Sequence, residues 1–184
     1  AIIILLRKNS NLSRRINMIN PMIENLSSVS LVNYEDSHYE HLSYELDETQ
    51  RRFTKTVYQN IKVEEVHKIN NKYPITILYQ ENPVGFFLLD RTVDHLIVTG
   101  NPNSILLRGL SLNPNFQGKG IAKQALLLVD SFVKIIAEDI DEIVLTVNIE
   151  NRYAYHLYLQ MDYKDTGRFK NGRYGLQHML FKRI

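Results

Sequence analysis

The sequence predicts one α/β (α+β) domain: a mixed, mostly antiparallel sheet of about seven strands with helices on both faces. Its 184 residues suffice for one buried core and are too few for two. Segments with strand-like alternation and segments with helical spacing follow one another in the order β-α-α-β-β-β-α-β-α-β-β. Strands joined by a helix run parallel and strands joined by a tight turn run antiparallel, so this order predicts both kinds of pair.

The N-terminal half is expected to form one strand, two helices and a hairpin. Alternation predicts a strand from Val29 to about Tyr34. From Asp36 to about Asn70 there is no proline or glycine, and apolar residues recur at helical spacing, which favours two helices. Two apolar runs, Pro74 to Tyr79 and Val84 to Leu89, flank the turn sequence Glu81-Asn82-Pro83 and predict a hairpin.

The C-terminal half continues the alternation. A loop rich in Gly, Asn and Pro precedes a strand in which Gly109 is expected to mark a bulge. The expected elements are a loop at Thr99 to Ser104, a strand at Ile105 to Leu112, a long buried helix from Gly118 to about Glu138, a strand at Ile143 to Val147, a helix at Asn151 to Gln160, and two strands between Tyr163 and Phe181 around Asn171-Gly172.

Composition excludes several kinds of site. The chain has no cysteine, so disulfides, thiolate zinc sites and a cysteine nucleophile are ruled out. The formal net charge is +2, but four basic residues precede the first acid, Glu24, and the remaining body is slightly acidic. Nucleic-acid binders concentrate Lys and Arg on a folded face, so no nucleic-acid partner is expected.

Residues 1–22 are expected to be a processed or vector-derived extension, and residues 23–184 the domain. The chain starts with Ala, and Met18 and Met22 stand just before more typical sequence. The apolar run Ala1 to Leu6 is far shorter than the roughly 20 residues that span a bilayer, and its charges follow it. We therefore expect a cytoplasmic protein without a membrane partner; an interaction arm is the alternative for this segment.

A glycine loop, Gln117 to Ala122, connects the predicted strand to the long helix. Gly118 and Gly120 would let a ligand approach the backbone, and N–H groups in the first helical turn favour phosphate there. Lys119 or Lys123 could add charge. The spacing fits neither a Walker loop nor the three-glycine dinucleotide motif. Steric relief in a tight turn is the alternative reading of the two glycines.

The same loop resembles the signature of the GNAT superfamily of acetyl-CoA-dependent N-acetyltransferases, which is Gln or Arg, two residues, Gly, one residue, then Gly or Ala. Gln117, Gly120 and Ala122 fill these places, and Leu112 and Pro114 match the apolar strand end and proline that precede the loop.

A second stretch, Asn151 to Tyr163, is similar to the family motif Asn-x-x-Ala-x-x-Leu-Tyr-x-x-x-Gly-Phe. Asp162 stands in place of the glycine and Tyr163 in place of the Phe. Asp tolerates the left-handed conformation better than most residues, so the turn is expected to persist.

The resemblance implies that the chain transfers an acetyl group from acetyl-CoA to a primary amine by direct attack in a ternary complex, without a metal. It places acetyl-CoA between two splayed parallel strands, Ile105 to Leu112 and Ile143 to Val147. The residues expected to bind it are Leu110, Leu112, Gln117, Gly118, Lys119, Gly120, Ile121, Ala122, Lys123 and Asn151.

Tyr158 resembles the family's general acid, which protonates the departing thiolate. Its place on an apolar helical face is equally typical of a packing residue. No acid occurs between Ser104 and Leu112, so the base is open; Glu45, Glu48 and Glu150 are candidates, although each suits a solvated face.

Two further pairs are discounted as sites. His38 and His41 lack a third metal ligand at clear spacing, and Arg51-Arg52 reads as a solvated pair rather than a phosphate clamp.

The resemblance implies a small-molecule or peptide amine as the acceptor and places the segment Tyr34 to Thr56 along the acceptor site. Acids in this segment suit a cationic acceptor such as a polyamine or aminoglycoside: Glu35, Asp36, Glu40, Glu45, Asp47 and Glu48. A homodimer would be typical of the family. The alternatives are an acyl-CoA-binding sensor with little turnover, and an interaction module that uses the basic N-terminal segment.

Overall fold

A computed structural model describes residues 28–184. The expected extension, residues 1–22, and the boundary at residue 23 lie outside the described residues.

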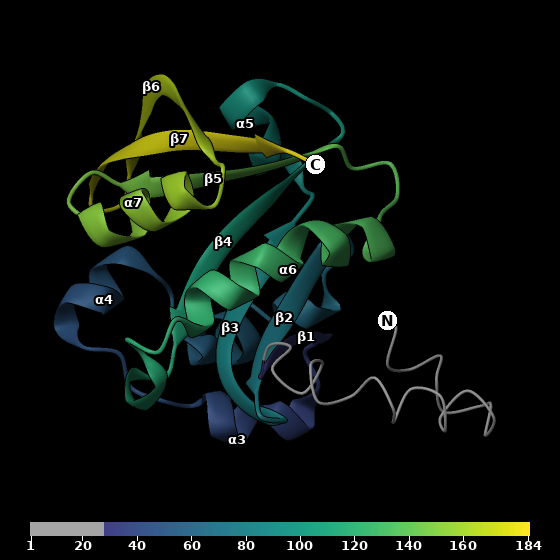
Figure 1. Cartoon of the computed structure of the whole chain (residues 1–184), viewed down its shortest axis with the longest axis vertical. Coiled ribbons are helices and arrows are strands. Elements are labelled where there is room, and N and C mark those ends of the chain that lie inside the picture. Colours follow the sequence, from purple (N-terminus) through teal and green to yellow (C-terminus); the bar gives the residue numbers. More distant parts are fainter. Residues whose placement is uncertain (1–27) are drawn as a thin grey trace, which may run out of the picture.

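One mixed sheet forms the centre of the structure, and its order β1-β2-β3-β4-β5-β7-β6 confirms the predicted fold class (Figure 1). β4 and β5 run parallel, and the other neighbouring strands are antiparallel. The strands are β1 (Val29–Asn33), β2 (Lys72–Tyr79), β3 (Asn82–Asp90), β4 (Ser104–Leu112), β5 (Glu142–Asn148), β6 (Lys164–Gly172) and β7 (Gly175–Arg183).

The helices are mostly short. The α-helices are α3 (Tyr39–Leu42), α4 (Glu48–Phe53), α5 (Leu96–Thr99), α6 (Ile121–Ile136) and α7 (Arg152–Gln160). Single 3₁₀ turns occupy Asp36–His38, Val66–Lys68, Val93–His95 and Pro114–Phe116, and Gln59–Val63 forms a π-helical turn. The helix α5 and the turn before it were not predicted.

The prediction of two helices between residues 36 and 70 was wrong, because the segment is broken into several short pieces. Asp47 caps α4 by accepting a hydrogen bond from Gln50 N at 2.7 Å, which starts a new helix there. Glu65 has a φ of 47°, which interrupts the helical path again. The breaks let Leu42 and Ile61 pack together on the sheet residue Phe86.

Both faces of the sheet are covered. α6 crosses one face beside α7 (Figure 1), and their apolar residues form the main core with those of β2 to β5. The short helices of residues 36–68 cover β3 on the other face, and Val98 of α5 packs there against Leu106 of β4 and Val144 of β5.

Three local details differ from the sequence reading. α6 begins at Ile121 rather than at Gly118, because Gly118 and Gly120 have φ values of 73° and 75°. The β2–β3 turn is formed by Gln80 and Glu81, since Tyr79 already pairs with Asn82. The β6–β7 turn lies at residues 173–174.

β4 and β5 separate along their length, as expected. They pair where Ser104–Leu106 lies beside Glu142–Val144, and the pairing in the described sheet stops there. Gly109 has a φ of 70°, and near it β4 gains one residue relative to β3, between the pairs Phe86↔Ser111 and Leu88↔Arg108. The expected bulge is thus present, and it bends β4 where the strands separate.

Within residues 28–184, none of the helices combines the length and apolar character needed to cross a bilayer.

Candidate active site

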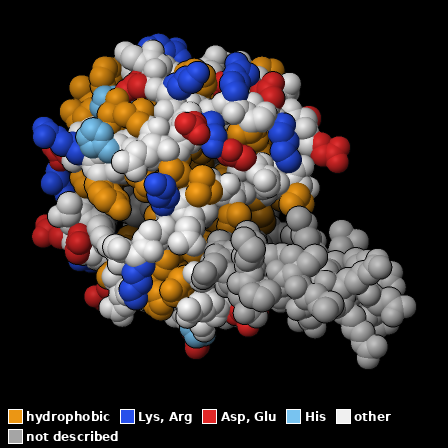
Figure 2. All heavy atoms as spheres, in the orientation of Figure 1, with side chains coloured by type: hydrophobic (Ala, Val, Ile, Leu, Met, Phe, Trp, Pro, Cys, Tyr) orange, Lys and Arg blue, Asp and Glu red, His pale blue; other side chains and the backbone are white. Residues whose placement is uncertain are grey.

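A cleft of about 740 Å³ opens between the separated ends of β4 and β5. The glycine loop, α4 and α7 complete its walls, and the space-filling view shows the surface hollowed between α4 and α7 (Figure 2). Ten of the eleven residues that the sequence singled out line it: Leu110, Leu112, Gln117, Gly118, Gly120, Ile121, Ala122, Lys123, Asn151 and Tyr158.

Lys119 is the exception. Its Nζ lies 4.9 Å from the centre of the Phe116 ring, and the residue does not line the cleft. Lys123, one turn into α6, does line it. Of the two candidate lysines, Lys123 is therefore the one placed to add charge to the cleft.

The glycine loop forms an open cradle at the start of α6. A Cβ built on Gly118 or Gly120 would meet no described heavy atom within 4 Å. No described neighbouring atom crowds the two glycines, and their positive φ is the backbone conformation for which this tight turn requires glycine. Gly120 is the N-cap of α6 and supplies no side-chain cap to the first-turn N–H groups. These groups are the ones that bind anions at helix N-termini.

The side chain of Gln117 holds this loop in place. Its Nε2 donates to the carbonyl oxygen of Leu112 at 3.0 Å, and its Oε1 accepts from Nε2 of Gln50 at 3.0 Å. The loop is thereby tied to the end of β4 and to α4. The sequence reading expected the segment that contains α4 to line the acceptor site; in the structure α4 also lines the first cleft.

Asn151 begins α7 at the mouth of the cleft. Its Oδ1 accepts a hydrogen bond from Ala154 N at 3.2 Å, so it caps the helix. The sequence reading placed Asn151 on the ligand; in the structure its oxygen is engaged by the helix and its amide NH₂ is available to the cleft.

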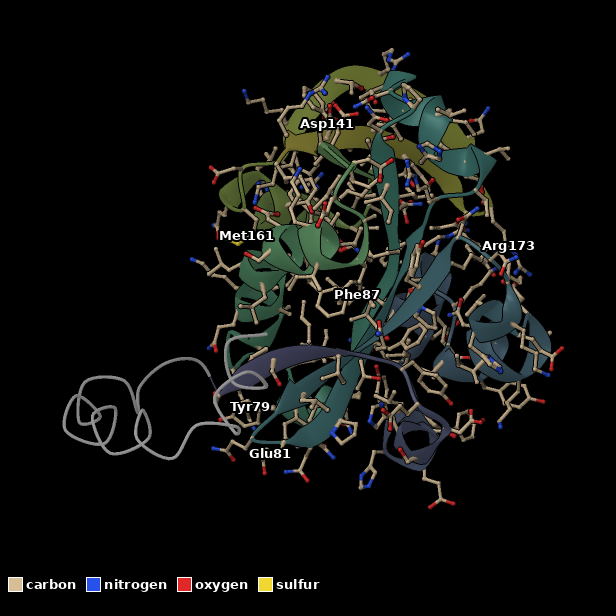
Figure 3. The ribbon with its side chains drawn as sticks, turned by 90° about the vertical axis from the view of Figure 1, so that its right-hand side faces the viewer. Tyr79, Glu81, Phe87, Asp141, Met161 and Arg173 are labelled. Carbon is tan, nitrogen blue, oxygen red and sulfur yellow. The ribbon has the colours of Figure 1, made fainter. Side chains whose placement is uncertain are left out.

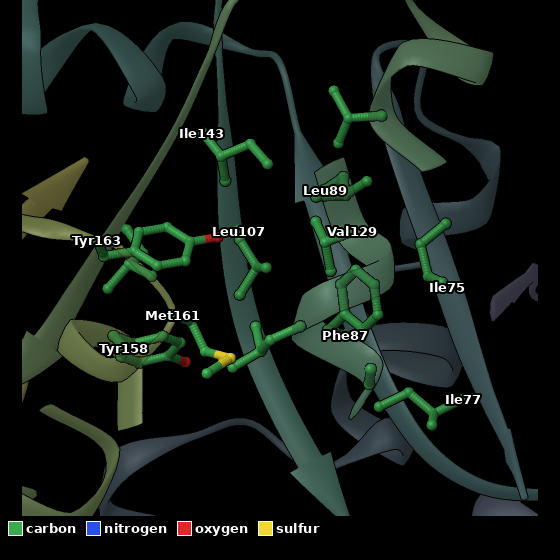
Figure 4. Close-up of a cluster of buried hydrophobic side chains, with 14 of the residues drawn as sticks. Ile75, Ile77, Phe87, Leu89, Leu107, Val129, Ile143, Tyr158, Met161 and Tyr163 are labelled. Carbon is green, nitrogen blue, oxygen red and sulfur yellow. The ribbon is translucent and has the colours of Figure 1, made fainter. Parts of the chain in front are cut away.

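Tyr158 is packed in the core and also lines the cleft. It is 8% exposed, its ring meets Tyr163 edge-on at 5.6 Å, and its hydroxyl points towards β4 (Figure 4). Burial raises the pKa of the Tyr158 hydroxyl well above its usual value of about 10. The group therefore stays protonated at neutral pH and can donate a proton, but it is no base.

A second cleft, of about 410 Å³, shares lining residues with the first. Arg108 and Gly109 of β4 and Thr146 and Asn148 of β5 line both. The two clefts therefore meet at the gap between the separated strands. The remaining walls come from residues 51–60, from α5 and from the β6–β7 hairpin.

Arg108 is held between two carboxylates. Its Nη1 lies 3.3 Å from Asp94 Oδ2 and 3.4 Å from Asp90 Oδ2. Burial alone would raise the pKa of Asp90, but hydrogen bonds from Thr92 and the charges of Lys72 and Arg108 outweigh it and hold that pKa below its usual range. Asp94 is the acid among the described residues that line the second cleft, and the sequence reading missed it.

The proposed bases lie elsewhere. Glu45, Glu48 and Glu150 line neither cleft, and Glu150 pairs with Arg52 at 3.4 Å. His38 accepts a hydrogen bond from Glu35 N at 3.2 Å and so caps a 3₁₀ turn.

Arg51 and Arg52, which the sequence presented as a solvated pair, both line the second cleft. Both remain exposed to solvent.

Residues 34–163 match the model of the acetyltransferase (GNAT) family. The chain is 37% identical over 154 residues to the protein named uncharacterized N-acetyltransferase YbbJ of Bacillus subtilis (strain 168), covering 83% of this chain and 95% of that protein. In fold it resembles spermidine N-acetyltransferase from Vibrio cholerae in complex with CoA and spermine (TM-score 0.61, 19% identity, 85% and 95% of the two chains). It also resembles aminoglycoside acetyltransferase AAC(6')-Ib in complex with coenzyme A (TM-score 0.66, 13% identity, 84% and 94%). The match to the family model and the likeness to YbbJ agree with both sequence motifs, and the chain belongs to the GNAT family of acetyltransferases.

Proposed function

We propose that the chain binds acetyl-CoA in the first cleft and transfers its acetyl group to a primary amine that enters through the second cleft. One observation carries the proposal: the glycine loop and Tyr158 line one cleft, and a second cleft reaches the same gap between β4 and β5. Donor and acceptor could thus meet without a covalent enzyme intermediate.

The donor's pyrophosphate is assigned to the loop of Gly118 to Ala122, where the first-turn N–H groups of α6 and the charge of Lys123 favour phosphate. Leu110 and Leu112 would pair with the pantetheine through backbone groups on the separated part of β4. The Asn151 amide would donate a hydrogen bond to the pantetheine as well.

The reaction begins when the uncharged amine attacks the thioester carbonyl and forms the new C–N bond. Negative charge develops on the carbonyl oxygen, the C–S bond breaks, and the electron pair leaves on sulfur. Tyr158 donates its proton to this sulfur, and the proton lost by the amine goes to water or a base at the second cleft. Positioning two substrates at one gap supplies much of the rate enhancement.

The acceptors named for structural relatives are spermidine, aminoglycosides and the N-terminus of ribosomal protein L7/L12, the last in the protein described as a ribosomal L7/L12 alpha-N-protein acetyltransferase. Each is an amine. This range supports a small-molecule or peptide amine as the acceptor of this chain.

The test is release of coenzyme A from acetyl-CoA in the presence of a panel of amines, with calorimetry of acetyl-CoA binding alongside. Amine-dependent release that is lost in Gly120→Val is expected. Tight binding of acetyl-CoA without turnover of any amine would instead identify an acyl-CoA-binding sensor. A folded protein that does not bind acetyl-CoA would refute the assignment of the first cleft.

A further inference from the structure

We propose that the acceptor is an anionic amine: a primary amine that also carries a phosphate or carboxylate group, which the second cleft binds. The inference rests on the proposed function, because it assigns a substrate class to the acceptor side of the same site.

Positive charge dominates the second cleft. Six basic residues line it: Arg51, Arg52, Lys55, Arg108, Lys170 and Arg173. Asp94 is the acid among the described lining residues. A cleft lined by one sign of charge concentrates ligands of the opposite sign.

Three of these cations already have carboxylate partners. Arg52 pairs with Glu150, Lys55 with Glu64, and Arg108 with Asp90 and Asp94.

The other three cations keep their charge available. Among residues 28–184, Arg51, Lys170 and Arg173 make no ion pair; Arg173 instead lies 5.2 Å from the centre of the Tyr174 ring. The positive excess of the cleft therefore remains after its internal pairs are counted.

The unpaired cations come from two separate elements that line the second cleft. Arg51 belongs to the last turn of α4, whereas Lys170 and Arg173 belong to the β6–β7 hairpin, with Arg173 at its turn (Figure 3). Thr146 and Asn148, at the gap between β4 and β5, line this cleft together with both of these elements. An acceptor that presents its amine at the gap would place its remaining groups between these cations. Guanidinium groups bind phosphate and carboxylate in bidentate fashion.

The acids that favoured a cationic acceptor do not line this cleft. None of Glu35, Asp36, Glu40, Glu45, Asp47 and Glu48 is among its lining residues, and Asp47 alone lines the first cleft. A polyamine would have to approach the gap past an excess of positive charge.

The test uses pairs of amines that differ by one anionic group. Glucosamine 6-phosphate is compared with glucosamine, and β-alanine with its amide, so that phosphate and carboxylate are assayed separately; spermidine is the cationic comparison. Coenzyme A release gives kcat/KM for each amine, and calorimetry on the protein loaded with coenzyme A gives binding without turnover. The expected result is that the anionic member of at least one pair is preferred at least tenfold in kcat/KM and in affinity, and that this preference falls as salt is added.

Arg51→Gln and Arg173→Gln should each reduce that preference about tenfold, the loss expected for one charge-assisted hydrogen bond. The double variant Arg51→Glu, Arg173→Glu should favour spermidine instead. Lys164→Gln is the matched control, since Lys164 is an exposed cation of the same hairpin that lines neither cleft. It should leave every preference unchanged, and melting curves establish that each variant is folded.

The inference would be overturned if kcat/KM were equal for the two members of each pair, or if the unmodified protein preferred spermidine. Either result would still be consistent with the proposed acetyltransferase function. Preferential binding of the anionic amine without any turnover would refute the proposed reaction and support the anion site. An anion preference that survives the double reversal would show that other residues bind the anionic group and would overturn this assignment.

Discussion

Replacing Gly120 with valine should weaken acetyl-CoA binding at least about 100-fold while leaving the domain folded. Gly120 has φ 75° and ψ 5°, a left-handed conformation that β-branched residues avoid. In the described structure nothing lies within 4 Å of its missing Cβ, so a valine side chain would extend into the open cradle where the pyrophosphate is proposed to bind.

Two costs are expected from this substitution, and they have different sizes. Strain in the left-handed region costs about 1 to 2 kcal/mol of stability, which corresponds to a fall in Tm of about 2 to 8 °C for a domain of this size. Displacing the pyrophosphate from two N–H groups would remove two charge-assisted hydrogen bonds, about 3 kcal/mol or more in total. The dissociation constant for acetyl-CoA should therefore rise at least about 100-fold.

Gly100 provides a matched control because its backbone is nearly the same, with φ 75° and ψ 4°, and its Cβ position is equally open. It ends α5 and lines neither cleft. Gly100→Val should lower Tm by a similar amount and leave the dissociation constant for acetyl-CoA unchanged. Calorimetry and thermal melts on both variants separate the two effects. Unchanged acetyl-CoA affinity in a folded Gly120→Val protein, or an equal loss in Gly100→Val, would refute the assignment of the loop.

Tyr158→Phe should lower kcat by about 10² to 10⁴ with acetyl-CoA affinity within a few fold, because the hydroxyl is proposed to protonate the departing sulfur. Single-turnover kinetics measure this loss, and Tyr155→Phe, on the same helix but outside both clefts, is the control. An affinity loss as large as the rate loss would indicate a binding role. Gln117→Leu removes two hydrogen bonds that hold the loop, and calorimetry should show acetyl-CoA binding weakened by about 1 kcal/mol, or about fivefold. Asp90→Asn should cost about 2 kcal/mol at pH 7, because Lys72 loses its carboxylate partner and Arg108 keeps only Asp94. Folding lowers the pKa of Asp90, so its contribution to the free energy of unfolding is present above the unfolded pKa of about 4 and is lost as pH falls through the lower folded pKa. Denaturant titrations at pH 7 and pH 3 should therefore show the free energies of unfolding of the parent and Asp90→Asn proteins converging in acid. A difference that stays constant between the two pH values would contradict the argument.

Much of the fold could be predicted from the sequence because the signals are local. Alternation in Ile75 to Tyr79 and in Ile143 to Val147 predicts strands, and the structure places strands at both, although β5 is buried on both of its faces. The failure between residues 36 and 70 has an equally physical cause: helical spacing reports which residues are buried together, and it does not report where Asp47 and Glu65 interrupt the backbone.

Part of the candidate site could likewise be predicted from local sequence, and part could not. The first cleft is anticipated by the sequence because a strand, two glycines and a helix start follow one another within a few residues, and the backbone itself forms the cradle. Lys119 could not be told from Lys123, since the direction of a side chain in a loop depends on its neighbours, here the Phe116 ring. The contact of Gln50 with Gln117 spans 67 positions and has no local signature.

By itself the sequence determined the order of the strands, the glycine loop and the two motifs of the family, because glycine positions and hydrophobic periods are properties of neighbouring residues. The tertiary structure alone decided which cations line the second cleft. Arg51, Arg108 and Arg173 share one cleft because the parting of β4 and β5 opens a gap and the packing of the short helices and the β6–β7 hairpin closes around it. Such proximity is fixed by the burial of apolar faces across the whole sheet, and no segment of the chain carries it alone.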